Sequence, residues 1–125
     1  MKALVTGSNG PMGKSIVEKL INDGHEVYGL DLAQNSTSMA HKYFKCDLED
    51  SSDISKVCTE ILRDNGLQIL VNNAAVTTEF LSTGYAEAFN KQTYEAFVTS
   101  LKINLAAPFL LSQKLFAMNY PELPK

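Results

Sequence analysis

A glycine-rich turn near the amino end is the first feature of the sequence that could support chemistry. Gly7, Gly10 and Gly13 separate an apolar run from a segment of helical periodicity. In such a turn the first glycine permits a sharp bend, the second lets the backbone approach a diphosphate, and the third lets the helix pack against the strand. The free N–H groups and the dipole of the helix N-terminus then face the anion. Because Pro11 has no N–H, Met12 and its neighbours are the expected donors. The spacing predicts a dinucleotide site, although glycines needed only for packing would give the same pattern.

An acidic residue at the end of the second apolar run strengthens this prediction. Asp31 follows Gly7 by 24 residues, where a carboxylate can accept hydrogen bonds from the hydroxyls of an adenosine ribose. The same carboxylate would repel a 2′-phosphate, and neither the segment 8–10 nor Leu32 supplies a cation to offset the repulsion. The sequence therefore predicts NAD rather than NADP as the cofactor. The alternative is that Asp31 is only a solvated strand end.

A phosphate-binding loop of the nucleoside triphosphatase type is the rival interpretation, because Gly13-Lys14-Ser15 resembles its end. That motif needs a glycine at position 8, which is Ser8, and Gly7 is one residue too early. The spacing disfavours triphosphate hydrolysis.

Short apolar runs alternate with segments of helical period, which predicts an α/β fold with a parallel sheet. The predicted strands are Lys2 to Thr6, Glu26 to Asp31, Lys42 to Cys46 and Gln68 to Val71, and the predicted helices are Pro11 to Asp23, a segment capped by Ser52 and stopped at Asn65-Gly66, and roughly Lys91 to Asn119. The polar stretch 32–40 stays ambiguous. Right-handed crossovers place the strands in the spatial order 3-2-1-4, the first half of a doubly wound, Rossmann-type sheet within one domain over residues 1–125.

Composition excludes several other classes of protein. The chain has 125 residues, a formal net charge of −3 and a single arginine, so a surface that binds nucleic acid is not expected. Its longest apolar run, residues 105–111, is too short to span a membrane, and no signal peptide is recognisable at the amino end. Cys46 and Cys58 lack the spacing of a zinc site. We expect a cytoplasmic protein in which both cysteines are buried thiols.

Five motifs in this order and spacing resemble the N-terminal, cofactor-binding half of short-chain dehydrogenases/reductases. They are Thr6-Gly7-x-x-Gly10-x-x-Gly13, Asp31, Asp47-Leu48, Asn72-Asn73-Ala74-Ala75 and Asn104. The resemblance implies an oxidoreductase that interconverts an alcohol and a ketone. It also implies a role in cofactor binding for Gly7, Ser8, Asn9, Gly10, Met12, Gly13, Asp31, Asp47, Leu48, Asn73 and Ala74. Among these, Asp31 would hold the adenosine ribose, and Asp47 with the Leu48 N–H would bracket the adenine. Asp47 could instead be a strand-end cap, and Asn73 could bond only to the sheet.

Asn104 has a physical interpretation of its own, because Pro108 stands four residues later. Proline offers no N–H and its ring pushes against the preceding turn, so the Asn104 carbonyl should be left free. The resemblance implies that this carbonyl holds a water molecule in the proton relay of the catalytic site. The alternative is a packing kink with an ordinary solvent water.

The family's Tyr-x-x-x-Lys pair is missing from the sequence. Four residues after its tyrosines stand Leu32, Asp47, Phe89, Val98 and Pro124. We therefore expect a chain truncated before the catalytic segment, which binds adenine nucleotide without turnover. A non-catalytic nucleotide-binding or interaction module derived from this fold is the alternative. The resemblance also implies a homo-oligomer formed through the last helix.

Overall fold

The computed structural model describes residues 1–64, 66–76 and 84–119, the last three of these by their backbone alone. Its strands are β1 (Lys2–Thr6), β2 (Glu26–Asp31), β3 (Lys42–Lys45) and β4 (Ile69–Val71). Its α-helices are α1 (Pro11–Asn22), α2 (Ser51–Arg63), α3 (Tyr94–Leu101) and α4 (Ala107–Asn119), with a 3-10 turn η1 (Phe89–Lys91) and a π-helical turn η2 (Lys102–Ala106). No helix among the described residues is long and apolar enough to cross a membrane.

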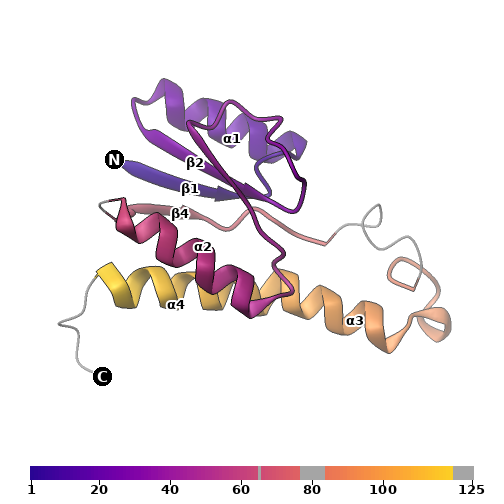
Figure 1. Cartoon of the computed structure of the whole chain (residues 1–125). Helices are drawn as coiled ribbons and strands as arrows, with labels where there is room; N and C mark the ends of the chain where they lie inside the picture. Colours follow the sequence, from indigo (N-terminus) through magenta and orange to yellow (C-terminus); the bar gives the residue numbers. More distant parts are fainter. Residues whose placement is uncertain (65, 77–83, 120–125) are drawn as a thin grey trace.

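The four strands form one parallel sheet in the order β3-β2-β1-β4, as the sequence predicts (Figure 1). Within it, Ala3 of β1 lies opposite Val27 of β2 on one side and Ile69 of β4 on the other. In the parallel pair of β2 and β3, Asp31 lies opposite Lys45. All four strands therefore end at the same edge, where a doubly wound sheet binds its ligand.

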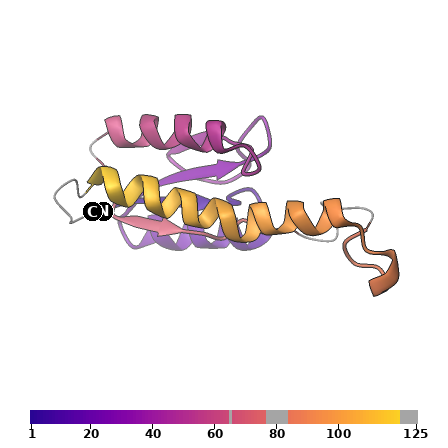
Figure 2. The same ribbon diagram turned by 90° about the horizontal axis from the view of Figure 1, so that it is seen from below.

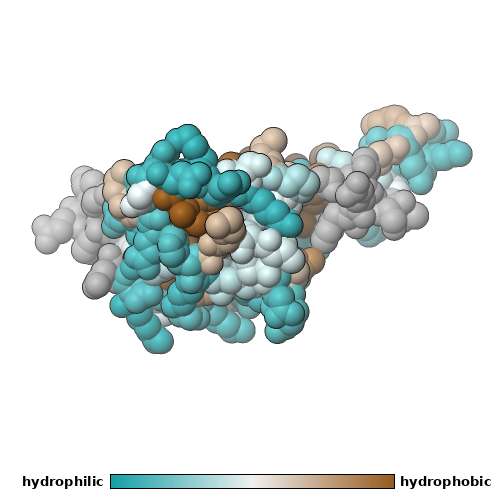
Figure 3. Space-filling model, turned by 90° about the horizontal axis from the view of Figure 1, so that it is seen from above, coloured by the Kyte–Doolittle hydropathy of each residue, from teal (hydrophilic) through white to brown (hydrophobic). Residues whose placement is uncertain are grey.

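Helices cover both faces of this sheet because successive side chains of β1 and β2 point to opposite faces. Val5 and Val27 pack against Val17 of α1 on one face. On the other face Leu4 and Leu30 belong to the larger core, which α2 and α4 complete. The two helices lie side by side in Figure 2, and α3 extends beyond the sheet. Seen from above, the molecule is mostly hydrophilic, with a small hydrophobic area near the middle (Figure 3).

Four predicted boundaries need correction. The helix α1 ends at Asn22 rather than Asp23, and β4 begins at Ile69 rather than Gln68. The N-cap of α2 is Asp50 rather than Ser52, because its carboxylate accepts hydrogen bonds from the backbone N–H groups of Ser52 at 2.8 Å and Asp53 at 3.3 Å. Strand β3 ends at Lys45, one residue before Cys46.

The last helical segment is also not the single helix predicted from Lys91. The helix α3 begins at Tyr94, where the hydroxyl of Thr93 caps it by accepting from the Ala96 N–H. It then widens into the π turn η2, closed by a bond from the Ala107 N–H to the Lys102 carbonyl. Pro108 explains the widening, because its ring and its missing N–H break the regular α-helical bonding one turn earlier.

Candidate nucleotide-binding site

A cleft of about 770 Å³ opens at the carboxyl ends of the four strands. That volume is within the range of small-molecule and cofactor sites. Its lining residues come from the strand ends and the loops that follow them, from the start of α1 and from the π turn η2: Gly7, Asn9, Gly10, Pro11, Met12, Gly13, Asp31, Leu32, Ala33, Cys46, Asp47, Leu48, Asn73, Ala74, Ala75 and Ile103. Every residue predicted to bind the cofactor is among them except Ser8. Asn104, predicted to take part in the proton relay, also lies outside the lining.

Glycine stands at the three positions of the turn for different physical reasons. Gly7 has φ +65°, and a β-carbon there would meet the Ala74 backbone at 2.9 Å. A β-carbon on Gly13 would lie 2.0 Å from the Gly7 carbonyl oxygen, so α1 packs on the turn only because that atom is missing. Gly10 is different, because its φ of −71° suits any residue and its β-carbon would have a single ordinary contact at 3.5 Å. The protein itself does not require glycine there, whereas a ligand lying against the backbone would. The cleft therefore fits a diphosphate.

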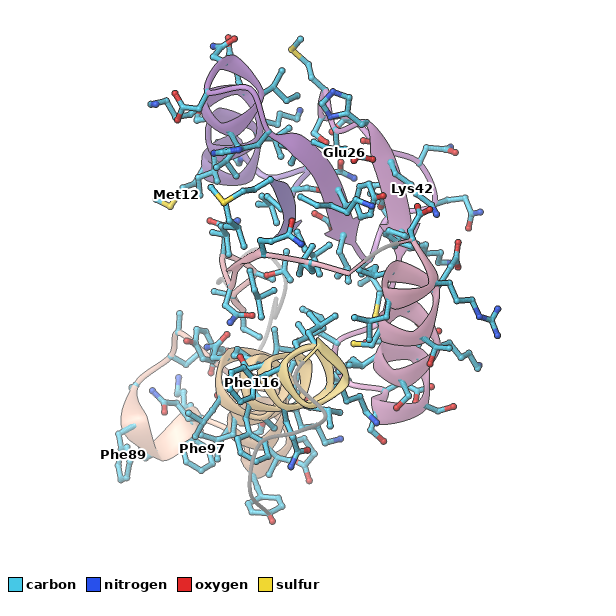
Figure 4. The ribbon with its side chains drawn as sticks, turned by 90° about the vertical axis from the view of Figure 1, so that its left-hand side faces the viewer. Met12, Glu26, Lys42, Phe89, Phe97 and Phe116 are labelled. Atoms are coloured by element: carbon cyan, nitrogen blue, oxygen red, sulfur yellow. The ribbon has the colours of Figure 1, made fainter. Side chains whose placement is uncertain are left out.

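The start of α1 leaves few backbone donors for that ligand. The Gly10 N–H donates to the Gly7 carbonyl, and the Lys14 N–H donates to the Gly10 carbonyl. The N–H groups of Met12 and Gly13 precede the first intrahelical donor and have no partner within the helix. They are the donors that the sequence predicts. The Met12 side chain is largely exposed and projects from the start of α1 (Figure 4).

The carboxylate of Asp31 is held in one orientation by the backbone. Its Oδ2 accepts from the Asn9 N–H at 2.9 Å, and its Oδ1 accepts from the Leu32 N–H at 2.8 Å. Each oxygen keeps a further lone pair for a ligand. An oriented acceptor with spare capacity is suited to a vicinal diol such as a ribose.

Asp47 and Leu48 line the cleft after β3, the strand next to the one that carries Asp31. The Oδ1 atom of Asp47 accepts from the Glu49 N–H at 2.9 Å, and the Asp47 N–H donates to Asp53 Oδ2 at 2.8 Å. Asp47 is thus a local cap of this loop as well as a lining residue. Glu49 connects the loop to α3, because its carboxylate accepts from the Thr99 hydroxyl at 3.1 Å.

The hydroxyl of Thr6, the first residue of the glycine motif, joins the ends of β1 and β4. Its oxygen accepts from the N–H groups of Asn73 at 3.1 Å and Ala74 at 3.0 Å. The side-chain amide of Asn73 in turn donates hydrogen bonds to the carbonyls of Thr6 and Gly7. Asn73 therefore shapes the cleft by holding the glycine turn. A threonine at the last position of the strand is the only sequence signal of this role.

Comparison with known proteins now identifies the family, because the short chain dehydrogenase family model matches residues 1–120. The chain belongs to this family. It is 31% identical over 121 residues to the 3-oxoacyl-[acyl-carrier-protein] reductase FabG of Buchnera aphidicola subsp. Schizaphis graminum, covering 90% of this chain and 47% of that protein. The chain thus spans about half the length of the curated relatives it matches.

Solved structures share the same fold. The structure of 4-hydroxyisoleucine dehydrogenase complexed with NADH has a TM-score of 0.80 and 24% identity, covering 97% of this chain and 50% of that one. A metagenomic short-chain oxidoreductase in complex with NADP has a TM-score of 0.77 and 23% identity, covering 94% and 56%. The family and the Rossmann-type fold predicted from the sequence are both confirmed.

Two predicted residues of this short-chain dehydrogenase chain lie outside the cleft for identifiable reasons. Ser8 is fully buried, its N–H donates to the Leu30 carbonyl, and its side chain packs against Gly29. Asn104 uses its side-chain oxygen to accept from the Val76 N–H at 2.7 Å, so it ties the loop after β4 to the π turn. Ser8 therefore packs the glycine turn against β2, and Asn104 holds the loop after β4.

The two cysteines carry no chemistry in this site. Burial raises the pKa of the Cys46 thiol to about 12 and that of the Cys58 thiol to about 11. Both stay protonated near neutral pH and are poor nucleophiles and poor metal ligands. Among the described residues there is no cluster that could hold a metal ion.

Proposed function

We propose that this chain forms the nucleotide-binding half of an NAD-dependent oxidoreductase that interconverts a secondary alcohol and a ketone. The observation that carries the proposal is the fixed carboxylate of Asp31 beside a glycine turn with room for a diphosphate at Gly10. When bound, a nicotinamide cofactor supplies hydride transfer.

Each part of the cleft has a role in this proposal. The N–H groups of Met12 and Gly13 donate to the diphosphate at the positive end of the α1 dipole. Asp31 accepts from the ribose hydroxyls, and Asp47 with the Leu48 N–H borders the adenine. Largely apolar walls, among them Ile103 of the π turn, exclude water from the remaining surface.

The preference for NAD over NADP depends on charge. A 2′-phosphate would lie against the Asp31 carboxylate, and residues 32–40 contain no lysine or arginine to compensate. The ammonium group of Lys45, on the neighbouring strand, donates to the Gln34 side chain at 3.0 Å. Solved structures of the same fold contain NADH or NADP, so affinity has to be measured for both.

Titration of the chain with NADH, NADPH and ADP tests the proposal. We expect binding of NADH and ADP, weaker binding of NADPH, and no turnover, because the sequence contains no Tyr-x-x-x-Lys pair. The absence of binding by all three at millimolar concentration would refute nucleotide binding. It would leave the second candidate, a non-catalytic interaction module.

An exposed apolar face on the α3 to α4 arm favours a role in association. Its large side chains are Tyr94, Phe97, Leu101, Leu105, Phe109 and Phe116. We infer that this face contacts a second copy of the chain, with or without nucleotide binding. A cytoplasmic location remains part of the proposal, in keeping with Cys46 and Cys58 as free, buried thiols.

A further inference from the structure

The loop between β2 and β3 has no regular secondary structure, yet it is fastened to the glycine turn by one side chain. The Nδ2 atom of Asn9 donates to the Asn35 carbonyl at 3.0 Å, and its Oδ1 accepts from the Thr37 N–H at 2.8 Å. One end of the amide faces a carbonyl and the other faces an N–H, so the amide has a single favourable orientation. Asn9 therefore holds the backbone of the loop at two points.

Two residues of β3, Tyr43 and Lys45, also contact this loop. The Tyr43 hydroxyl donates to the Ala33 carbonyl at 2.6 Å and lies 3.4 Å from the Asn9 amide nitrogen. Lys45 donates to the side chain of Gln34. Burial raises the pKa of Tyr43, and the nearby Asp31 charge adds to the shift, so the phenol remains a hydrogen-bond donor. These contacts keep the loop in one position beside Asp31.

The position of the loop affects the cofactor because the loop continues directly from the ribose-binding residue. Leu32 and Ala33 line the cleft next to Asp31. In the proposed function Asp31 would bind the 2′-hydroxyl of the adenosine ribose. NADP carries its extra phosphate at this 2′ position. A phosphate there must share the space bounded by Asp31 and the residues that follow it. Residues 32–40 contain no lysine or arginine, and the ammonium of Lys45 is already bonded to Gln34. A phosphate beside Asp31 would therefore have no free cation in the loop as it stands, and the loop would have to move to accommodate it.

From these contacts we propose that the side chain of Asn9 is a specificity-determining positioning residue. By fixing residues 33–37 beside Asp31, it denies a 2′-phosphate the room it would need, and the preference for NADH over NADPH then depends on Asn9 as well as on Asp31. The inference rests on the proposed function. It assigns to the Asn9 amide a role separate from that of the Asn9 N–H, which orients the Asp31 carboxylate.

The variant Asn9→Ala separates the two roles, because it removes the amide and keeps the backbone N–H. Dissociation constants for NADH and NADPH are measured by fluorescence titration. The ratio of the NADPH constant to the NADH constant is then compared between the variant and the unsubstituted chain. We expect Asn9→Ala to lower this ratio about tenfold, roughly the effect of one or two lost hydrogen bonds. Tyr43→Phe, which loses the bond to Ala33, should lower it in the same direction by a smaller factor.

Asn35→Ala is the matched control, because it removes an amide from the same loop but keeps the carbonyl that accepts from Asn9. Its ratio should equal that of the unsubstituted chain, and thermal unfolding establishes that each variant is folded. A chain that prefers NADH while both Asn9→Ala and Tyr43→Phe keep the full ratio would overturn this inference and leave the proposed function standing. A chain that binds neither dinucleotide, or binds both equally, would overturn the NAD proposal and this inference together.

Discussion

The carbonyl oxygen of Gly7 lies 2.0 Å from the place where a β-carbon on Gly13 would be, whereas the nearest atom to a β-carbon on Gly10 is 3.5 Å away. Gly13 is therefore needed for the packing of α1 on the turn, whereas the fold does not need glycine at position 10, and we propose that Gly10 serves nucleotide binding. This difference can be tested with a matched pair of variants.

Gly13→Ala should destabilise the chain by about 1–3 kcal/mol or more, because the added methyl group forces the start of α1 away from the turn. Gly10→Ala should leave the free energy of unfolding unchanged or raise it by up to about 1 kcal/mol, because its backbone angles suit alanine. Yet Gly10→Ala should weaken NADH binding roughly tenfold, since its methyl group occupies the diphosphate position. Urea unfolding and NADH titration of both variants measure these effects. Full affinity in Gly10→Ala would show that no ligand approaches this backbone.

Removing the Asp31 carboxylate tests the ribose contact. We expect Asp31→Ala to weaken NADH binding by about 1–3 kcal/mol, the cost of losing hydrogen bonds to a charged acceptor. NADPH should lose less affinity, because the repulsion of its 2′-phosphate disappears at the same time. Asp23→Ala is a suitable control, since its carboxylate pairs with Lys19 at the far end of α1. Equal affinity of Asp31→Ala and the unsubstituted chain for NADH would contradict the assignment.

Much of the fold could be predicted because it is encoded in local patterns. The periodicity of α2 and the apolar runs of β1 and β2 each depend on nearby residues, and crossover handedness then orders the strands. Ser8 shows where local reasoning stops. Its place in the glycine turn suggested a ligand contact, but the fold turns its side chain toward Gly29, a residue on another strand.

The long-range hydrogen bonds around the cleft had no local signal either. Asn104 bonds to Val76, 28 residues away, and Asn9 bonds to Thr37 across the same span. Such pairings depend on how strands and loops meet in three dimensions, which periodicity does not encode. For this reason the sequence identified the backbone turn of the site, while the side chains that support it became visible only in the structure.

The pH dependence of stability should report on Tyr28. Its buried hydroxyl donates to Asp64 at 2.9 Å, and this bond, helped by the charge of Lys42, lowers the pKa of the Asp64 carboxyl. A carboxyl with a lowered folded-state pKa adds stability above its unfolded pKa of about 3.9, and that stability is lost as the pH falls through the folded-state value. Tyr28→Phe should therefore lower the free energy of unfolding more at pH 7 than at pH 3.

Urea unfolding at both pH values measures this difference. Tyr94→Phe, at an exposed tyrosine, controls for the loss of a hydroxyl as such. A cost for Tyr28→Phe that is the same at pH 7 and pH 3 would show that the Asp64 carboxylate is not the partner that matters.

The exposed face of the α3 to α4 arm predicts self-association. Phe97 and Phe116 lie on this arm, far from the strand residues Glu26 and Lys42 (Figure 4). Leu105, which lies between the two phenylalanines in the sequence, is 67% exposed. Several large apolar side chains exposed along one helical arm are typical of an interaction site. We expect a dimer at about 100 μM, a concentration at which contacts of micromolar affinity are saturated, and mainly monomer for Leu105→Lys, because the buried contact would have to accommodate two charges. Met39→Lys is the matched control, since Met39 is 70% exposed but lies outside this face. Sedimentation velocity distinguishes the states: a monomeric unsubstituted chain, or a Leu105→Lys variant as dimeric as Met39→Lys, would rule out this face as the contact.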